Sequence, residues 1–251
     1  MTDCDDSVWL ESVPAGTPSA LTYDELLAQA EFNFDARQIT DKADGEALGT
    51  WPDEGPHGYD AAADAKYVWR NGANGINGEP AILANAGVGE IILPDAADNL
   101  ANTAGGLTIF VIREGSAVDA LIAKVGDPTN QFWEFNGFQG YVYTDPGAPI
   151  AAERAIGSSD ADARIDLFRW DPGSLTAIYK DGVLLGSAAA PAASKQLGTQ
   201  DVQLLSDGAF NVWVGLCGQI VGWTPSLGIA DINTVLAGLS AAWSIAVTPL
   251  T

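Results

Sequence analysis

The chain has 251 residues and a formal net charge of −22, because 33 acidic residues outnumber 11 basic ones. Hydrophobic residues make up 47% of the sequence, which indicates a globular protein with a core and excludes a disordered chain. Nucleic acid and anionic membrane surfaces are bound through clustered Lys and Arg, so we expect neither as a partner.

The N-terminal segment predicts an extended arm followed by a short helix. The arm carries acids and prolines, and Thr22 then lies three residues before Glu25. This spacing is typical of a capping box, in which each side chain accepts a hydrogen bond from the other residue's amide. We expect the helix to run to about Ala30. The sequence thus predicts an arm with a short helix over residues 1–31 and a β-rich domain over residues 32–251.

The same segment bears on the compartment in which the protein is made. Its first ten residues contain no basic region followed by an apolar one, so we expect no signal peptide and synthesis in the host cytoplasm. Cys4 and Cys217 lie far apart in the sequence and do not form a disulfide framework. We expect one free surface thiol and one buried thiol.

The middle of the chain predicts short strands joined by turns. Residues 31–100 are rich in Gly, Asn, Asp and Pro, and longer apolar segments begin at Leu107. Asn136-Gly137 and Asp181-Gly182 have the composition of two-residue hairpin turns. The predicted strands are Leu107–Ile112, Ala120–Val125, Phe132–Phe135, Phe138–Tyr143, Arg164–Trp170, Leu175–Lys180, Val183–Ser187, Val202–Leu205 and further strands between Phe210 and Trp223.

One helix closes the chain. Its apolar residues recur at helical spacing and are Ile229, Ile232, Val235, Leu236, Leu239 and Trp243. Many short strands separated by frequent turns are typical of a two-sheet sandwich. We therefore predict an all-β fold, a two-sheet antiparallel jelly-roll sandwich with a short N-terminal helix and a short C-terminal helix.

Catalysis is not expected from these residues. Hydrolases on such sandwiches use alternate carboxylates on one strand in a Glu-x-Asp-x-Glu motif, and no Glu in this chain is followed two positions later by Asp. His57 is the one histidine, and its Gly-Pro-His-Gly context predicts an exposed turn rather than a catalytic base. We therefore predict no catalytic residues, no bound cofactor and no enzyme activity, with acids recruited from separate loops as the alternative.

Calcium is the metal that the acidic loops suit best, because it prefers oxygen ligands. Asp160 with Asp162, and Asp127 with Asn130, are the candidate ligands. The alternative is that these acids are solvated and bind nothing.

An aromatic hairpin is the candidate carbohydrate site. Trp133, Phe138 and Tyr141 lie on its two strands, and aromatic rings stack on sugar faces. Alternate residues of a strand point to opposite faces of the sheet. Core packing of these rings is therefore the alternative.

Several motifs together resemble a known family. They are Phe34–Arg37, Gly49–Asp53, His57–Ala61, Ile76–Ala81, Ile178–Ser187 and Cys217–Trp223 with the helix that follows. In order and spacing they resemble the concanavalin A-like, laminin-G-like jelly-roll domains, of the kind found in phage structural proteins. The sequence departs from the family at two places. Pro56 interrupts the turn, and Gln219 with Val221-Gly222 stands where an acid-bearing strand is usual.

The resemblance implies two stacked antiparallel sheets and does not imply one function. Together with the missing catalytic motif, the acidic charge and the N-terminal arm, it favours a non-enzymatic structural protein on the exterior of a virion: a capsid decoration, head-fibre or tail-associated protein. Its partners would be other capsid or tail proteins, and a homo-oligomer is left open. The expected docking residues are Trp9, Leu21, Leu26 and Leu27. The alternative is a carbohydrate-binding, lectin-like module or adhesin for a cell-surface glycan, and a glycoside hydrolase comes third.

Overall fold

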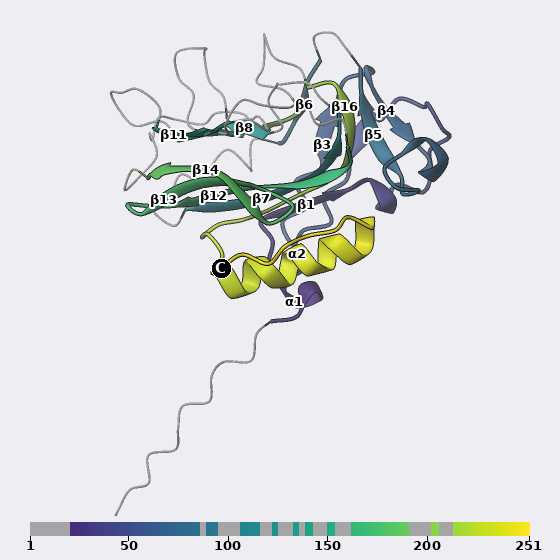
Figure 1. Cartoon of the computed structure of the whole chain (residues 1–251). Coiled ribbons are helices and arrows are strands. Elements are labelled where there is room, and N and C mark those ends of the chain that lie inside the picture. Colours follow the sequence, from purple (N-terminus) through teal and green to yellow (C-terminus); the bar gives the residue numbers. More distant parts are fainter. Residues whose placement is uncertain are drawn as a thin grey trace, which may run out of the picture.

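The computed structural model describes residues 21–85, 89–94, 106–115, 122–124, 133–135, 139–142, 150–153, 162–190, 202–205 and 213–251. These residues form three layers, which are two antiparallel sheets and a pair of helices (Figure 1). The predicted arrangement of two antiparallel sheets with two short helices is therefore confirmed. The jelly-roll connectivity stays a prediction.

Sheet A is the middle layer. Its strands follow the order β14-β13-β12-β7-β16-β5-β4, and β1 pairs with β16. Their bounds are β1 (Phe32–Asp35), β4 (Tyr67–Arg70), β5 (Ala81–Ala84), β7 (Leu107–Glu114), β12 (Arg164–Asp171), β13 (Leu175–Lys180), β14 (Val183–Ala189) and β16 (Gly215–Trp223).

Sheet B stacks on one face of sheet A and follows the order β11-β10-β9-β8-β15-β6-β3-β2. Its strands are β2 (Thr50–Trp51), β3 (Ala61–Ala63), β6 (Ile91–Ile92), β8 (Ile122–Lys124), β9 (Trp133–Phe135), β10 (Gln139–Val142), β11 (Ile150–Glu153) and β15 (Val202–Leu204). Strand β11 was not predicted from the sequence, because its residues are mostly small and do not alternate. Two short 3₁₀ helices, η1 (Ala36–Gln38) and η2 (Gly72–Asn74), lie in the connections.

Of the two predicted two-residue turns, the one at Asp181-Gly182 is confirmed, whereas the register at the other pairs Phe135 with Gly140 and leaves four residues between them. Lys180 of β13 lies opposite Val183 of β14, so Asp181-Gly182 is a two-residue turn. The φ angles of these two residues, 50° and 83°, are both positive, as a type I′ turn requires. Strands β9 and β10 pair antiparallel across Asn136-Gly137, which lies outside the described residues.

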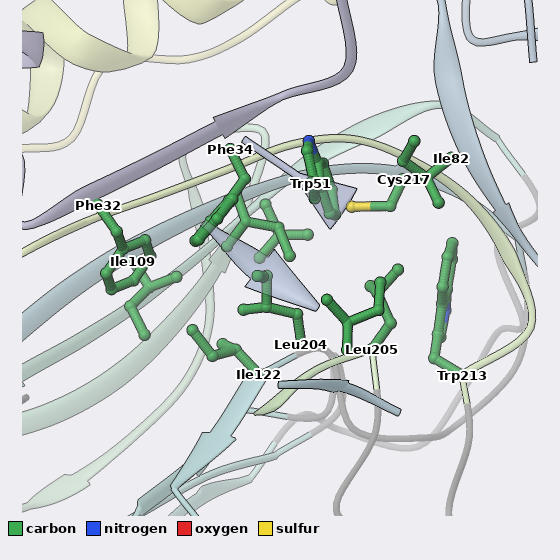
Figure 2. Close-up of a cluster of buried hydrophobic side chains, with 14 of the residues drawn as sticks. Phe32, Phe34, Trp51, Ile82, Ile109, Ile122, Leu204, Leu205, Trp213 and Cys217 are labelled. Carbon is green, nitrogen blue, oxygen red and sulfur yellow. The ribbon is translucent and has the colours of Figure 1, made fainter. Parts of the chain in front are cut away.

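The main core fills the space between the two sheets. Phe32 and Ile109 come from sheet A, Ile122 and Leu204 from sheet B, and all four are fully buried. Figure 2 shows these side chains meeting from both sheets, with Trp51 beside Phe34.

A second core lies between sheet A and the helices α1 (Tyr23–Leu27) and α2 (Ile229–Trp243). The predicted apolar face of α2 is confirmed, except that Ile229 at its first position is 40% exposed. Figure 1 shows α2 lying across the face of sheet A that points away from sheet B. Neither helix among the described residues is both long and apolar enough to cross a membrane.

The N-terminal helix belongs to this second core. The predicted capping box between Thr22 and Glu25 is confirmed, although the helix ends at Leu27 rather than near Ala30. Leu26 is 2% exposed, and its carbonyl accepts a hydrogen bond from the Trp223 indole at 2.9 Å. The side chain of Leu26 therefore stabilises this chain's own fold.

A buried polar network fastens α2 to sheet A. Gln219 of β16 is 1% exposed, and its Oε1 accepts a hydrogen bond from Trp243 Nε1 at 3.0 Å. Its Nε2 donates to Asn33 Oδ1 of β1 at 2.8 Å. Beside this bridge the Arg37 guanidinium stacks over the Trp243 ring and is paired with Asp35. The amide of Gln219 therefore links three elements.

Glycines on β16 let large rings pack against its backbone. A Cβ at Gly222 would overlap the Phe32 ring, and one at Gly218 would overlap the Trp243 ring. Larger side chains at these positions would therefore push apart β1 or α2 from the sheet.

We expect Gly222→Ala to lower the free energy of unfolding by about 1–3 kcal/mol, because the added methyl overpacks the core against Phe32. Urea denaturation measures the loss. The double variant Gly222→Ala with Phe32→Leu should lose less free energy of unfolding than the two single variants lose together, because the smaller side chain relieves the overlap. Strict additivity, or a Gly222→Ala variant as stable as the parent, would contradict this packing.

We expect Leu26→Ala to destabilise the isolated chain by about 2–5 kcal/mol, as for other buried leucines. Leu27→Ala is the matched control and should cost less, because Leu27 is only partly buried. Equal and negligible effects of both substitutions on thermal unfolding would show that α1 does not contribute to the fold.

Candidate functional site

The outer face of sheet B, the face that points away from sheet A, is the candidate site. In the central strand β15, Val202 and Leu204 are fully buried in the core between the sheets. Gln203 between them therefore belongs to the outer face, because residues alternate along a strand. The same reasoning places Thr50 and Ile92 on this face, since Trp51 and Ile91 are in the core.

One row of residues crosses the whole of this face. Each of its members is the antiparallel partner of the next, so the row runs straight across the strands. In order from β2 to β11 the row is Thr50, Ala62, Ile92, Gln203, Ala123, Glu134, Tyr141 and Ala151. Two positions along the strands, Gln139 lies opposite Glu153 on the same face.

Gln203 is the notable member of the row. It is 6% exposed, yet its Oε1 has no hydrogen-bond partner among the residues that the structure describes. Leaving a buried acceptor unpaired costs about 1–3 kcal/mol. A donor that reached this buried oxygen would recover that cost.

The register separates the three aromatic residues predicted for carbohydrate binding. Tyr141 lies in the row, opposite Glu134. Trp133 is one position from Glu134 along β9, and one position changes the face of the sheet. Phe138 lies outside the described residues. Gln203 was not predicted from the sequence, although it is a polar residue between two apolar ones, which is the available signal.

An open hollow of about 410 Å³ adjoins the β2 end of the row. Thr50 belongs both to the row and to the lining of this hollow. The lining of the hollow includes the buried residues Ile39 and Leu48. Its polar groups come from Gln38, Thr40, Asp41 and Lys42.

A second hollow, of about 430 Å³, lies near the C-terminal segment and contains Asp162. Of the predicted calcium ligands, Asp162 is exposed there, and Asp127, Asn130 and Asp160 lie outside the described residues. Within the described ranges, no three His, Cys, Asp or Glu side chains gather closely enough to hold a metal ion. The calcium site stays a prediction.

His57 and Cys217 do not form a nucleophile–base pair. The His57 side chain is 47% exposed, stacks on Tyr59 and lies 3.8 Å from Glu31. Its predicted place in an exposed turn is confirmed. Cys217 is free and fully buried in the core, where burial raises the pKa of its thiol and keeps it protonated.

The predicted docking residues lie in different surroundings. Leu26 is buried, and Leu21 and Leu27 are partly buried against the core between the helices and sheet A. Trp9 lies outside the described residues. Docking on a virion stays a prediction.

The sequence matches no protein-family model and no curated protein. In structure, the chain is similar to Trypanosoma rangeli sialidase in complex with the inhibitor DANA, with a TM-score of 0.52 and 14% identity over 82% of this chain. It is also similar to a tryptophan-to-alanine mutant of HCR/D, with a TM-score of 0.55 and 12% identity over 87% of this chain. The chain spans 32% of the sialidase and 53% of HCR/D. At such identities the likeness concerns the fold.

We expect Asp181→Asn to stabilise the protein at pH 7 and to have no such effect near pH 3. Burial raises the pKa of the Asp181 carboxyl, so the ionised form is disfavoured in the folded chain. This cost is present at neutral pH and disappears once the carboxyl is protonated in both states, below its ordinary pKa of about 3.9. An asparagine oxygen can still accept the hydrogen bond that Asp181 accepts from the Ile165 amide at 2.8 Å.

Thermal unfolding at both pH values measures this effect. Asp162→Asn is the control, because Asp162 is an exposed carboxyl in the hollow near the C-terminal segment, which Asp181 also lines. A gain in melting temperature that persists near pH 3 would show that the burial of charge is not its cause.

Proposed function

We propose that the chain is a non-catalytic, carbohydrate-binding module with a lectin-like, concanavalin A-like sandwich, and that it binds its ligand on the outer face of sheet B. The observation that carries this proposal is the row through Gln203, Glu134 and Tyr141. The register brings the positions of a Gln, a Glu and a Tyr into one row, and binding sites for polar ligands combine aromatic residues with a few polar ones.

The geometry of the row supports an extended polar ligand. Row members on adjacent strands are spaced by about 4.8 Å. Thr50 at the end of the row also lines the open hollow, to which Gln38, Thr40, Asp41 and Lys42 contribute polar groups. Gln203 near the middle of the row has a buried acceptor without a partner among the described residues, and a sugar hydroxyl that reached this oxygen would supply the missing donor.

The sequence supports binding rather than hydrolysis. Hydrolases on such sandwiches carry alternate carboxylates on one strand, and no Glu in this chain is followed two positions later by Asp.

We expect Gln203→Leu to weaken glycan binding by about tenfold, because one hydrogen bond to the ligand is lost. The same substitution should leave the free energy of unfolding unchanged or higher, because it removes an unpaired buried oxygen. Gln29→Leu, in an exposed glutamine beside α1, is the matched control and should affect neither quantity.

Calorimetric titration with a panel of oligosaccharides is the suitable measurement. Intrinsic fluorescence is less suitable, because each tryptophan side chain that the structure describes is buried. An absence of binding to every glycan in the panel, or equal affinities of Gln203→Leu and the parent, would contradict the proposal. Release of reducing ends from the panel would replace it with a hydrolase.

A further inference from the structure

The hollow beside Thr50 is built entirely from residues that the structure describes. Its lining comes from two segments, residues 38–42 around the end of η1 and residues 48–50 with Pro52 around strand β2. Its volume of about 410 Å³ lies within the range of small-molecule sites, which is about 300–1,000 Å³. Because β2 is the last strand in the order of sheet B, the row through Gln203 ends at this hollow.

The wall of the hollow is fixed by the main core. Ile39 and Leu48 belong to both the lining and the core, and they are 5% and 1% exposed. The Leu48 amide donates to the Tyr67 carbonyl of β4 at 2.8 Å, which ties this wall to sheet A. A wall held in this way does not have to be ordered when a ligand binds, so less affinity is lost.

A turn at Gly49 keeps space open in the lining. The Thr50 amide donates to the Leu48 carbonyl at 2.8 Å and closes a three-residue turn, in which the φ angle of Gly49 is 71°. A Cβ at Gly49 would have no heavy atom of a described residue within 4 Å, its chain neighbours left aside. The turn thus places the buried Leu48 and the exposed Thr50 on either side of a position that has no side chain.

Several polar residues of the lining are accessible to a ligand. Gln38, Thr40, Asp41 and Thr50 are exposed, and they offer an amide, two hydroxyls and a carboxyl. Together these groups both donate and accept hydrogen bonds, as the hydroxyls of a sugar do. A ligand rich in hydroxyls therefore matches this lining better than an apolar one.

From this geometry we infer that the hollow is a terminal subsite, which holds one sugar unit of a glycan whose other units lie along the row. The inference rests on the proposed carbohydrate-binding function. Thr50 and Gln203 are three strand spacings apart in the row, which is about 14 Å. A single sugar ring does not span this distance. The ligand class is therefore an oligosaccharide rather than a free monosaccharide, and its affinity rises when one molecule occupies both places.

The test is calorimetry with glucose, galactose and their oligomers up to the hexasaccharide. We expect the parent to bind oligomers that reach the hollow about tenfold or more tightly than the monosaccharides. The double variant Thr50→Val with Gln38→Ala should weaken binding of these oligomers by about tenfold, because hydrogen bonds to the end unit are lost. Thr234→Val in α2, on the other side of sheet A, is the matched control and should leave the affinity unchanged.

The outcomes separate this inference from the proposed function. Oligosaccharides that bind the double variant as tightly as the parent, or a monosaccharide that binds as tightly as its oligomers, would overturn the inference and leave carbohydrate binding standing. Gln203→Leu distinguishes the two claims, because it should weaken binding on the row while the hollow is intact. If no glycan binds the parent, both the inference and the proposed function fail.

Discussion

The buried amide of Gln219 is the interaction on which the layers depend. It accepts a hydrogen bond from Trp243 of α2 and donates one to Asn33 of β1, and so it connects a helix, a central strand and an edge segment of sheet A. Glycines on the same strand, Gly218 and Gly222, leave room for the Trp243 and Phe32 rings. A buried network of this kind is stable only when its members are paired, so loss of one partner would loosen the helix layer as a whole.

This fastening makes the two sheets unequal. Sheet A is covered on one face by the helices and on the other by sheet B, so both of its faces contribute to hydrophobic cores. Sheet B contributes one face to a core, and its outer face carries the row through Gln203. Antiparallel sheets commonly have one packed face and one polar face. The candidate site lies on the polar face, with its backbone held in place by the core beneath Val202 and Leu204.

Local sequence signals predicted the elements well, and long-range pairing explains what they missed. The capping box at Thr22, the turn at Asp181-Gly182 and the apolar face of α2 each depend on residues close in sequence, and all three are confirmed. The row of the candidate site joins Thr50 to Gln203 through strands that pair only in the folded chain. No local spacing could bring these residues together. The role of Gln219 was hidden for the same reason, since its partners lie near both ends of the described chain.

The central claim is that a glycan binds across the outer face of sheet B, and nuclear magnetic resonance tests it directly. In a ¹⁵N-labelled sample titrated with a neutral oligosaccharide that binds, the account predicts that the Gln203 side-chain amide and the backbone amides of β9, β10 and β15 shift together. Signals from α2 and from the hollow around Asp162 should stay in place. Shifts confined to α1, α2 or that hollow would contradict the account, because they would place the ligand away from sheet B.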